Sequence, residues 1–447
     1  MRVAMDPTDE GLSREITKWD LIALFVNVTV GAGIFRLPAD VQRTVGNYSL
    51  PAFALCAVIV GLIALCFAEV GSRFSGTGGP YLYARETFGP LLGFTVGWLL
   101  WLTRLGGFAT LVQVLVAYLG YFWPTVESGL ARAGVITGIV VVLTVINIKG
   151  VRQSARIGDV FTVSKLIPLF LFVAVGIFFV SPARLTLGTR PDFGPFAGAV
   201  LILIFAFSGF EAVLVNSGEI RQPQKVIPFA LFSALGAVVV LFVLIQVVCV
   251  GTLPQLTTSE RPLVDASERF FGALGPTIIS AGAIVGIVGT LNAVMLALTR
   301  LPFAMAVQGQ LPAPLTRVHT RFRTPHISIL VSAAGALFLS LAGTFVYAVK
   351  ITVITRVIVY TSTCLALPIL RRRSTTITPR SLSTGFELPA GMLISVVCVV
   401  LCLWLLANSG LSEVRDVAIA VALGLAFYAA TKLSQRRGPP ISRFMDL

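Results

Sequence analysis

This chain of 447 residues has the composition of a protein embedded in a membrane. Hydrophobic residues make up 56% of it and charged residues 12%, whereas a soluble protein carries about 25% charged residues; mean hydropathy is +0.90. The net charge is +14, but lysine and arginine cluster between apolar stretches, as the positive-inside rule describes. Composition therefore excludes a soluble globular protein, and the charge pattern argues against a nucleic-acid partner.

Apolar stretches long enough to cross a bilayer recur along the whole chain. A membrane-spanning helix needs about 20 predominantly apolar residues. Twelve such spans are predicted, near residues 20–45, 49–73, 90–122, 131–148, 156–180, 195–219, 226–251, 273–305, 326–344, 346–370, 387–407 and 412–433. We therefore expect an all-α, polytopic membrane protein, and the polar N-terminus followed by a long apolar run does not resemble a signal peptide.

The loops between the spans differ in charge. Basic residues gather near 149–156, 221–225, 317–323, 371–380 and 432–443, and few lie in the alternate loops. The positive-inside rule then predicts that both termini are cytoplasmic. We also expect that the protein lies in the cell (plasma) membrane.

The first span is interrupted near its middle by Gly31-Ala32-Gly33. Glycine costs roughly 1 kcal/mol in a helix relative to alanine, so the triplet predicts a helix that unwinds inside the membrane. Open backbone at that depth is tolerated where it is buried in protein or lines a cavity. Close packing of small residues between helices is the alternative interpretation.

Charged residues occur inside five of the predicted spans. Arg36 and Asp40 are spaced i, i+4 in the first span and are predicted to form a structural pair. Arg104 in the third span and Arg356 in the tenth need partners in hydrocarbon; Glu211 is one candidate. Lys165 in the fifth span either snorkels towards the cytoplasm or titrates and acts in ion coupling.

The sixth span is interrupted at Ser208-Gly209. Breaks at corresponding places in two halves of a chain point to an inverted-repeat transporter and its binding site. Glu211 follows the break and is a functional candidate by default: it either senses or carries a proton, or braces the broken helix. Phe205 and Phe207 precede the break, and one of them is a candidate lid over a bound solute.

Together the two breaks suit a zwitterionic solute. The start of a half-helix offers free N–H groups and a partial positive charge to a carboxylate, and the ends of the opposing half-helices offer carbonyls to an ammonium group. The candidate substrate-binding residues are Thr29, Gly31, Ala32, Gly33, Ile34, Phe205, Phe207, Ser208 and Gly209.

Cysteine and histidine do not form a recognisable metal motif. The six cysteines lie in apolar stretches without metal-ligand spacing, and the two histidines lie in or beside one basic loop. We expect no metal and no cofactor. The sequence also lacks H-E-x-x-H, G-x-S-x-G and paired intramembrane carboxylates, so we do not expect an enzyme.

Four runs in this order resemble a known family. They are GAGIF at 31–35, FSGTGGPYLYARETFG at 74–89 with GFTVGW at 93–98, FAFSGFEA at 205–212, and RLPFAMAVQGQLPAPLTRVHTRFRTP at 300–325. Over about residues 15–373 the chain resembles the amino acid–polyamine–organocation (APC) superfamily of transporters.

The resemblance implies a LeuT-type fold of five plus five inverted spans, two further spans and alternating access. The implied organisation is an N-terminal tail (1–18), a transporter core (19–373, with repeats at about 19–180 and 195–373), spans eleven and twelve (374–435) and a C-terminal tail (436–447). The site is expected between spans one, three, six, eight and ten.

The resemblance also implies roles for individual residues. Ala32 and Gly33 would donate backbone N–H groups to the substrate carboxylate, and Phe205 would close over the substrate. Glu211 matches an acidic position linked to proton sensing in some members, and Lys165 matches a lysine that stands in for sodium. Ala32 replaces the family's serine or threonine, so a relative's substrate preference does not transfer directly.

The sequence therefore predicts a secondary transporter of amino acids, small or apolar neutral ones favoured, coupled to protons or working by exchange. A polyamine or cationic amino-acid carrier is one alternative and would need an extra carboxylate facing the site. A non-transporting nutrient receptor is an alternative from another class.

Overall fold

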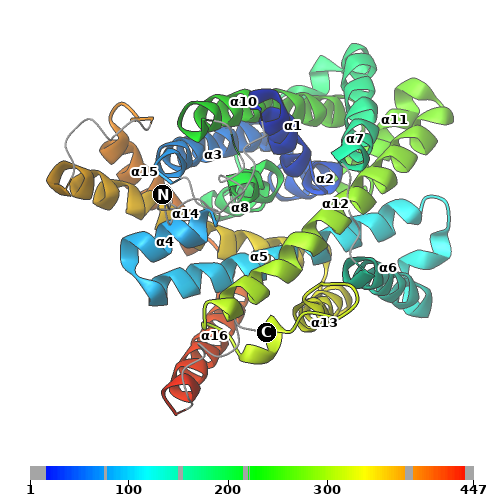
Figure 1. Ribbon diagram of the computed structural model, residues 1–447. Helices are drawn as coiled ribbons and strands as arrows, with labels where there is room; N and C mark the ends of the chain where they lie inside the picture. Colours follow the sequence, from blue (N-terminus) through cyan, green and yellow to red (C-terminus); the bar gives the residue numbers. More distant parts are fainter. Residues whose placement is uncertain are drawn as a thin grey trace.

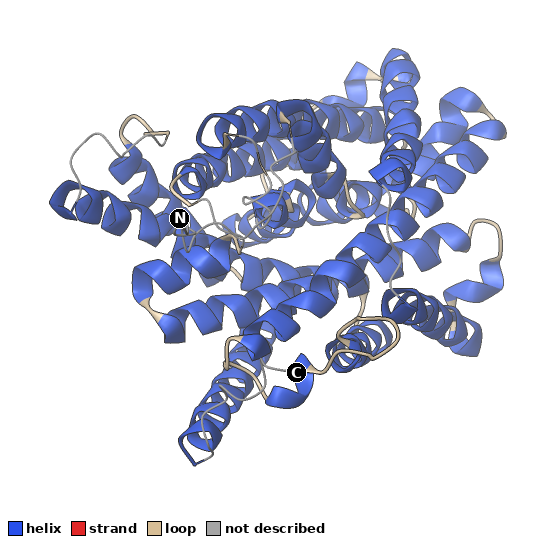
Figure 2. Ribbon diagram, viewed as in Figure 1, coloured by secondary structure: helices blue, strands red, loops and turns tan. Residues whose placement is uncertain are grey.

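The computed structural model describes residues 17–74, 78–149, 155–214, 220, 222–377 and 386–437. In these ranges the regular elements are helices joined by loops (Figure 2). Most of the two predicted tails, residues 1–16 and 438–447, lies outside the described residues.

The helices follow the predicted apolar stretches closely. They are α1 (Lys18–Thr29), α2 (Gly33–Val45), α3 (Ser49–Ser72), α4 (Pro80–Phe88), α5 (Pro90–Leu119), α6 (Gly129–Lys149), α7 (Ala155–Gly176), α8 (Phe193–Phe207), α9 (Phe210–Val213), α10 (Pro223–Thr252), α11 (Pro262–Phe271), α12 (Leu274–Val307), α13 (His326–Ala342), α14 (Phe345–Ile377), α15 (Gly391–Ala407) and α16 (Leu411–Arg437). The first predicted span comprises α1 and α2, and the sixth comprises α8 and α9.

Seven helical segments of the described chain are long and apolar enough to cross a membrane. They are Gly33–Ser72, Pro90–Leu119, Gly129–Lys149, Gln224–Thr252, Leu274–Val307, Phe345–Arg373 and Leu411–Leu433. Four shorter apolar helices, of 10–17 residues, accompany them. The protein is thus an all-helical, multi-pass membrane protein, and the twelve crossings remain a prediction.

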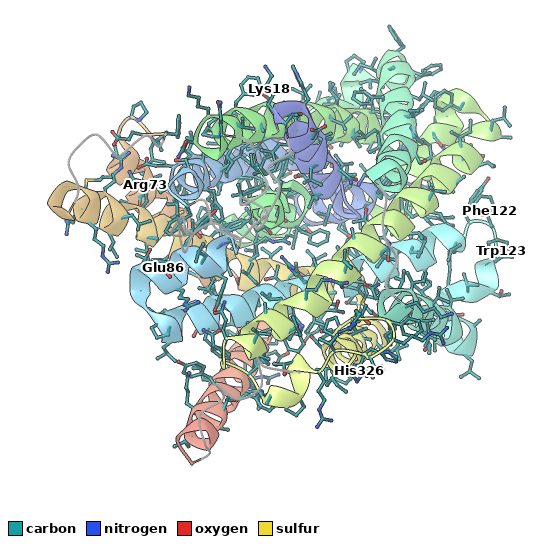
Figure 3. All side chains as sticks on the ribbon, in the orientation of Figure 1. Lys18, Arg73, Glu86, Phe122, Trp123 and His326 are labelled. Carbon is teal, nitrogen blue, oxygen red and sulfur yellow. The ribbon has the colours of Figure 1, made fainter. Side chains whose placement is uncertain are left out.

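The outer surface of the bundle is apolar. Phe170, Phe338, Val400 and Leu423, on four different helices, are between 56% and 70% exposed. Large apolar side chains in such positions suit contact with lipid chains rather than with water. Trp123 projects from the rim of the molecule beside Phe122, just beyond the end of α5 (Figure 3), where an aromatic side chain suits the membrane–water interface.

The middle of the bundle is occupied by α8. In Figure 1, α3 and α10 lie on one side of it and α5 and α12 on the other. Helices α2, α3 and α14 pack directly against α8, and α5 packs against α12, α13 and α14. Helices α15 and α16 lie at the periphery (Figure 1). The broken helices are therefore enclosed by protein, as open backbone in a membrane requires.

The element order repeats. A broken helix (α1/α2), a long helix (α3), a short helix (α4) and a second long helix (α5) are followed later by α8/α9, α10, α11 and α12 in the same order. The short helices have 9 and 10 residues, and each begins with proline and ends before a glycine. The two halves therefore share a local architecture although their sequences are only weakly alike.

A buried carboxylate joins two of the long helices at one end. Glu69 of α3 is fully buried and lies 2.6 Å from Arg371 Nη2 of α14 and 2.8 Å from Arg73 Nη2. It also accepts a hydrogen bond of 3.0 Å from the Leu388 backbone N–H. One side chain thus holds α3, α14 and the segment before α15 together.

The Glu69→Gln substitution tests this role. Removing one partner of a buried ion pair costs on the order of 3–5 kcal/mol, because the remaining charge stays desolvated, so the unfolding temperature of the detergent-solubilised protein should fall markedly. Arg415→Gln is the control, since that arginine is 70% exposed in its pair with Asp416 and exposed pairs contribute about 0–1 kcal/mol. Equal unfolding temperatures for the two variants would contradict the assignment.

Candidate functional site

The first break lies between α1 and α2. Helix α1 ends at Thr29, the Gly31 N–H bonds the Thr29 carbonyl at 2.8 Å, and α2 begins at Gly33. Ala32 is the N-cap of α2 and provides no side-chain cap. The first N–H groups of a helix have no intrahelical partner, so the start of α2 leaves donors and a partial positive charge for a ligand.

The second break lies between α8 and α9. Helix α8 ends at Phe207, Ser208 is extended, and Gly209 has a φ of +119°, a conformation that L side chains rarely adopt. Helix α9 starts at Phe210. Glu211 accepts a hydrogen bond of 2.9 Å from the Gly209 N–H. The Glu211 carboxylate thus provides a hydrogen-bond acceptor for a backbone N–H that the break exposes.

The two breaks lie directly against each other. A Cβ on Gly33 would stand 2.9 Å from Cα of Ala206, and a Cβ on Gly209 would stand 3.0 Å from the carbonyl oxygen of Val28. Only glycine permits these approaches. Both interpretations of the triplet therefore hold for different residues, because Gly33 serves close packing while Gly31 lies open beside it.

A cavity of about 280 Å³ opens where the breaks meet. Its lining comes from α1 and the first break (24–32), α5 (100–111), α8 and α9 with their break (205–213), α12 (289–297) and Arg356 of α14. These belong to predicted spans one, three, six, eight and ten, the five between which the sequence analysis expects a site.

Most of the predicted binding residues line this cavity. They are Thr29, Gly31, Ala32, Phe205, Ser208 and Gly209, together with Glu211 and Arg104. Gly33, Ile34 and Phe207 are not in the lining. Ile34 and Phe207 are fully buried, and the Phe207 ring packs 5.3 Å from that of Phe242. Of the two candidate lids, Phe205 is therefore the one that faces the cavity.

Glu211 is the centre of a polar cluster in the cavity wall. Its carboxylate lies 2.9 Å from Arg356 Nε and accepts a hydrogen bond of 2.8 Å from the Tyr360 hydroxyl. Arg356 also donates to the hydroxyl of Ser208. Both members of the ion pair are nearly buried, at 5% and 12% exposure. The geometry is that of a brace for the broken helix, and a role in proton transfer stays a hypothesis.

Lys165 of α7 is buried, at 2% exposure, and reaches the broken first span. Its Nζ donates to the Asn27 carbonyl in the last turn of α1 at 2.5 Å and to Thr290 Oγ1 of α12 at 3.4 Å. A cation there complements the negative end of the α1 dipole. The ammonium group therefore points to the cavity wall rather than snorkelling to the surface.

The other intramembrane charges have separate partners. Arg104 Nη1 donates to the Ala297 carbonyl at 2.7 Å and is not paired with Glu211. Arg36 lies 3.4 Å from Asp40 and also contacts Glu260 in the loop before α11. This group lies on α2 beyond the cavity lining.

Sequence reasoning missed several residues of the site. Asn27 and Thr290 line the cavity and hold Lys165, and Tyr360, which is not in the lining, holds Glu211. Asn27 is a polar residue in an apolar stretch, and this contrast could have identified it as a candidate site residue from the sequence. Thr290 and Tyr360 are ordinary members of apolar helices, and only the packing of the helices brings them to the site.

Three cysteines outside the cavity lining gather between α3, α14 and α15. The sulfur atoms of Cys66, Cys364 and Cys398 lie within 4.8 Å of one another, and those of Cys66 and Cys398 are 3.8 Å apart. All three are buried. Thiolates at such separations have the geometry to hold a soft metal ion, but the prediction of no metal site is not tested by geometry alone.

The chain matches the amino acid permease family over residues 16–428, and it belongs to that family, within the APC superfamily. The protein is therefore a membrane transporter and not an enzyme. A helical bundle with a cavity where two interrupted helices meet agrees with that class.

Named relatives are similar over most of their length. A methylthioribose transporter of Bacillus subtilis is 30% identical over 88% of this chain and 88% of its own. The serine/threonine exchanger SteT of the same organism is 28% identical over 94% and 97%. An arginine/agmatine antiporter of Chlamydia pneumoniae is 26% identical over 91% and 88%. These substrates differ in charge, so family membership alone does not select one.

The Gly33→Ala substitution tests the crossing of the broken helices. The added methyl meets the backbone of Ala206, so the helices must move apart, and we expect a lower unfolding temperature and loss of transport. Gly61→Ala in α3 is the matched control, because nothing lies within 4 Å of its Cβ position and alanine favours a helix by roughly 1 kcal/mol. Unchanged stability in Gly33→Ala would overturn the packing role.

Proposed function

We propose that this protein is a secondary active transporter that moves amino acids across the cell membrane by alternating access. One observation carries the proposal: two broken helices border the same cavity. The backbone at Gly31 and Ala32, directly before the positive end of α2, suits a carboxylate, and the carbonyls at the ends of α1 and α8 suit an ammonium group. Every amino acid carries both groups.

The repeated element order supports a LeuT-type architecture. In this proposal residues 19–180 and 195–373 form two inverted repeats, residues 374–435 form spans eleven and twelve, and residues 1–18 and 436–447 are cytoplasmic tails. The parallel sequence of broken, long, short and long helices in the two halves supports this division.

The position of the cavity supports one state of the transport cycle. Its lining includes α1 and the residues after the second break, but no residue of α2 or of α8 before Phe205. On the far side of the breaks, the Tyr118 hydroxyl donates to the Phe35 carbonyl at 2.9 Å. With the N-terminus inside the cell, the protein faces inward and its outer half is closed.

Lys165 is the proposed coupling residue. Its Nζ links α7 to α1 and α12, two helices that line the cavity. A change in its charge would alter its hold on the end of α1. Proton symport and amino-acid exchange both suit this arrangement, and a sodium ion would be repelled by an ammonium group there.

The alternatives lack the group that they need. A polyamine or a cationic amino acid requires a carboxylate facing the cavity, and Glu211, the acidic residue in the described lining, already holds Arg356 and Tyr360. Much of the remaining wall is glycine and aliphatic, including Leu24, Val28, Gly107 and Ala293, which supports a small substrate. The other alternative, a receptor that binds an amino acid without transporting it, differs from a transporter in having no flux, which the next experiment measures.

Transport by the purified protein in liposomes tests the function. We expect uptake or counterflow of at least one labelled amino acid, stimulated by an inward proton gradient in the case of symport or by internal amino acid in the case of exchange. Protein-free liposomes are the control. Binding without any flux would favour the receptor, and neither binding nor flux of any amino acid would overturn the proposal.

The Lys165→Ala substitution tests coupling. An alanine at position 165 has no charge that could change and no group that holds α1, so we expect a lower transport rate that no longer depends on pH. Lys149→Ala, at the exposed end of α6, is the control. An unchanged rate and pH profile would exclude Lys165 from coupling.

A further inference from the structure

The cavity wall carries an uncompensated positive charge. Its ionisable side chains, among the described lining residues, are Arg104, Arg356 and Glu211. Arg356 and Glu211 neutralise each other at 2.9 Å. Arg104 takes part in none of the ion pairs of the described chain; its described contact is the neutral Ala297 carbonyl, 2.7 Å from Nη1. Two cations and one anion give the wall a net charge of +1.

This guanidinium is poorly satisfied by the protein itself. Arginine has five N–H donors and stays protonated in proteins, and the hydrogen bond to Ala297 uses one of them. A charged side chain at membrane depth is costly and normally faces a partner or a cavity. Arg104 lies in the middle of α5 and faces the cavity, so its other donors are available to whatever occupies that space.

Two further basic side chains, Lys165 and Arg300, lie near the cavity but outside its lining. Lys165 Nζ binds Asn27, a lining residue. Arg300 lies one turn beyond Ala297 on α12, and its described hydrogen bonds go to the Leu296 carbonyl and the Thr299 hydroxyl, both neutral. A wall with a net positive charge raises the local concentration of anions.

The α-carboxylate of an amino acid does not account for Arg104. The proposed function already assigns that group to the N–H donors at the start of α2, near Gly31 and Ala32. Arg104 stands on a different helix of the same cavity. It is therefore suited to a second carboxylate, at the other end of the substrate, and a planar guanidinium binds a carboxylate through two parallel hydrogen bonds.

We infer that the transported substrate is an acidic amino acid of the aspartate or glutamate type, and that Arg104 selects it by binding the side-chain carboxylate. The inference rests on the proposed function. It differs from the sequence analysis, which favours a substrate with a neutral side chain, because it assigns a substrate with an anionic side chain. It also explains why the cavity of this protein presents an arginine that forms no ion pair with a carboxylate of the described chain.

Selectivity of the unaltered protein is the first test. Counterflow of labelled L-glutamate and L-aspartate is measured in liposomes against L-serine, L-leucine and L-arginine at equal concentration. We expect the acidic pair to be transported best and L-arginine least. Transport of neutral amino acids alone would overturn the inference and leave the proposed function standing, whereas no transport of any amino acid would overturn both.

Arg104 variants provide the second test. In Arg104→Gln the side chain keeps hydrogen-bonding capacity but loses its charge, so acidic transport should fall about tenfold or more, which corresponds to ~1.4 kcal/mol, while transport of L-serine is kept or rises. Arg104→Lys should retain part of the acidic transport. Arg415→Gln, on the exposed face of α16, removes one positive charge outside the cavity. It should change neither the transport of acidic amino acids nor that of L-serine.

Two outcomes contradict the assignment. Equal loss of acidic and neutral transport in Arg104→Gln, with folding verified by its unfolding temperature, would mean that Arg104 binds the common α-carboxylate. Unchanged acidic transport would mean that Arg104 does not touch the substrate. Should Arg104→Gln fail to fold, the Arg104→Lys variant and the selectivity of the unaltered protein still decide the question.

Discussion

A helix that breaks inside a membrane exposes N–H and C=O groups where little water is available to satisfy them. At the second break this constraint is met by Glu211, which accepts the Gly209 N–H and is held in turn by Arg356 and Tyr360. The broken backbone of α8 and α9 is thereby tied to α14. Because Arg356 and Tyr360 already bind this carboxylate, it leaves no unpaired negative charge in the wall of the cavity.

The charge that remains in the cavity follows from this use of Glu211. Arg104 has no carboxylate of its own in the described chain and binds a backbone carbonyl of α12 instead. Family membership defines a transporter, and its relatives carry substrates of different charge. Family membership therefore does not determine the substrate, and the side chains that line the cavity have to select it. For this reason the position of Arg104 bears on the substrate of this protein.

Sequence patterns predicted the helices well and the site in part. Apolar length is a local property, so the predicted stretches coincide with the helices, and Gly31-Ala32-Gly33 marks the break between α1 and α2. The pairing of charges was not predictable in the same way. Glu211 was a candidate partner of Arg104, yet it lies against Arg356, because the packing of α14 on α8 decides which arginine comes within reach.

By itself, the sequence determined that the chain is a multi-span helical membrane protein with two interrupted helices, since hydropathy and glycine act through neighbouring residues. Tertiary structure alone decided that Gly33 packs on Ala206 while Gly31 stays open, that Phe205 rather than Phe207 faces the cavity, and that Lys165 binds the end of α1. These outcomes depend on contacts between segments far apart in the chain, which no local pattern encodes.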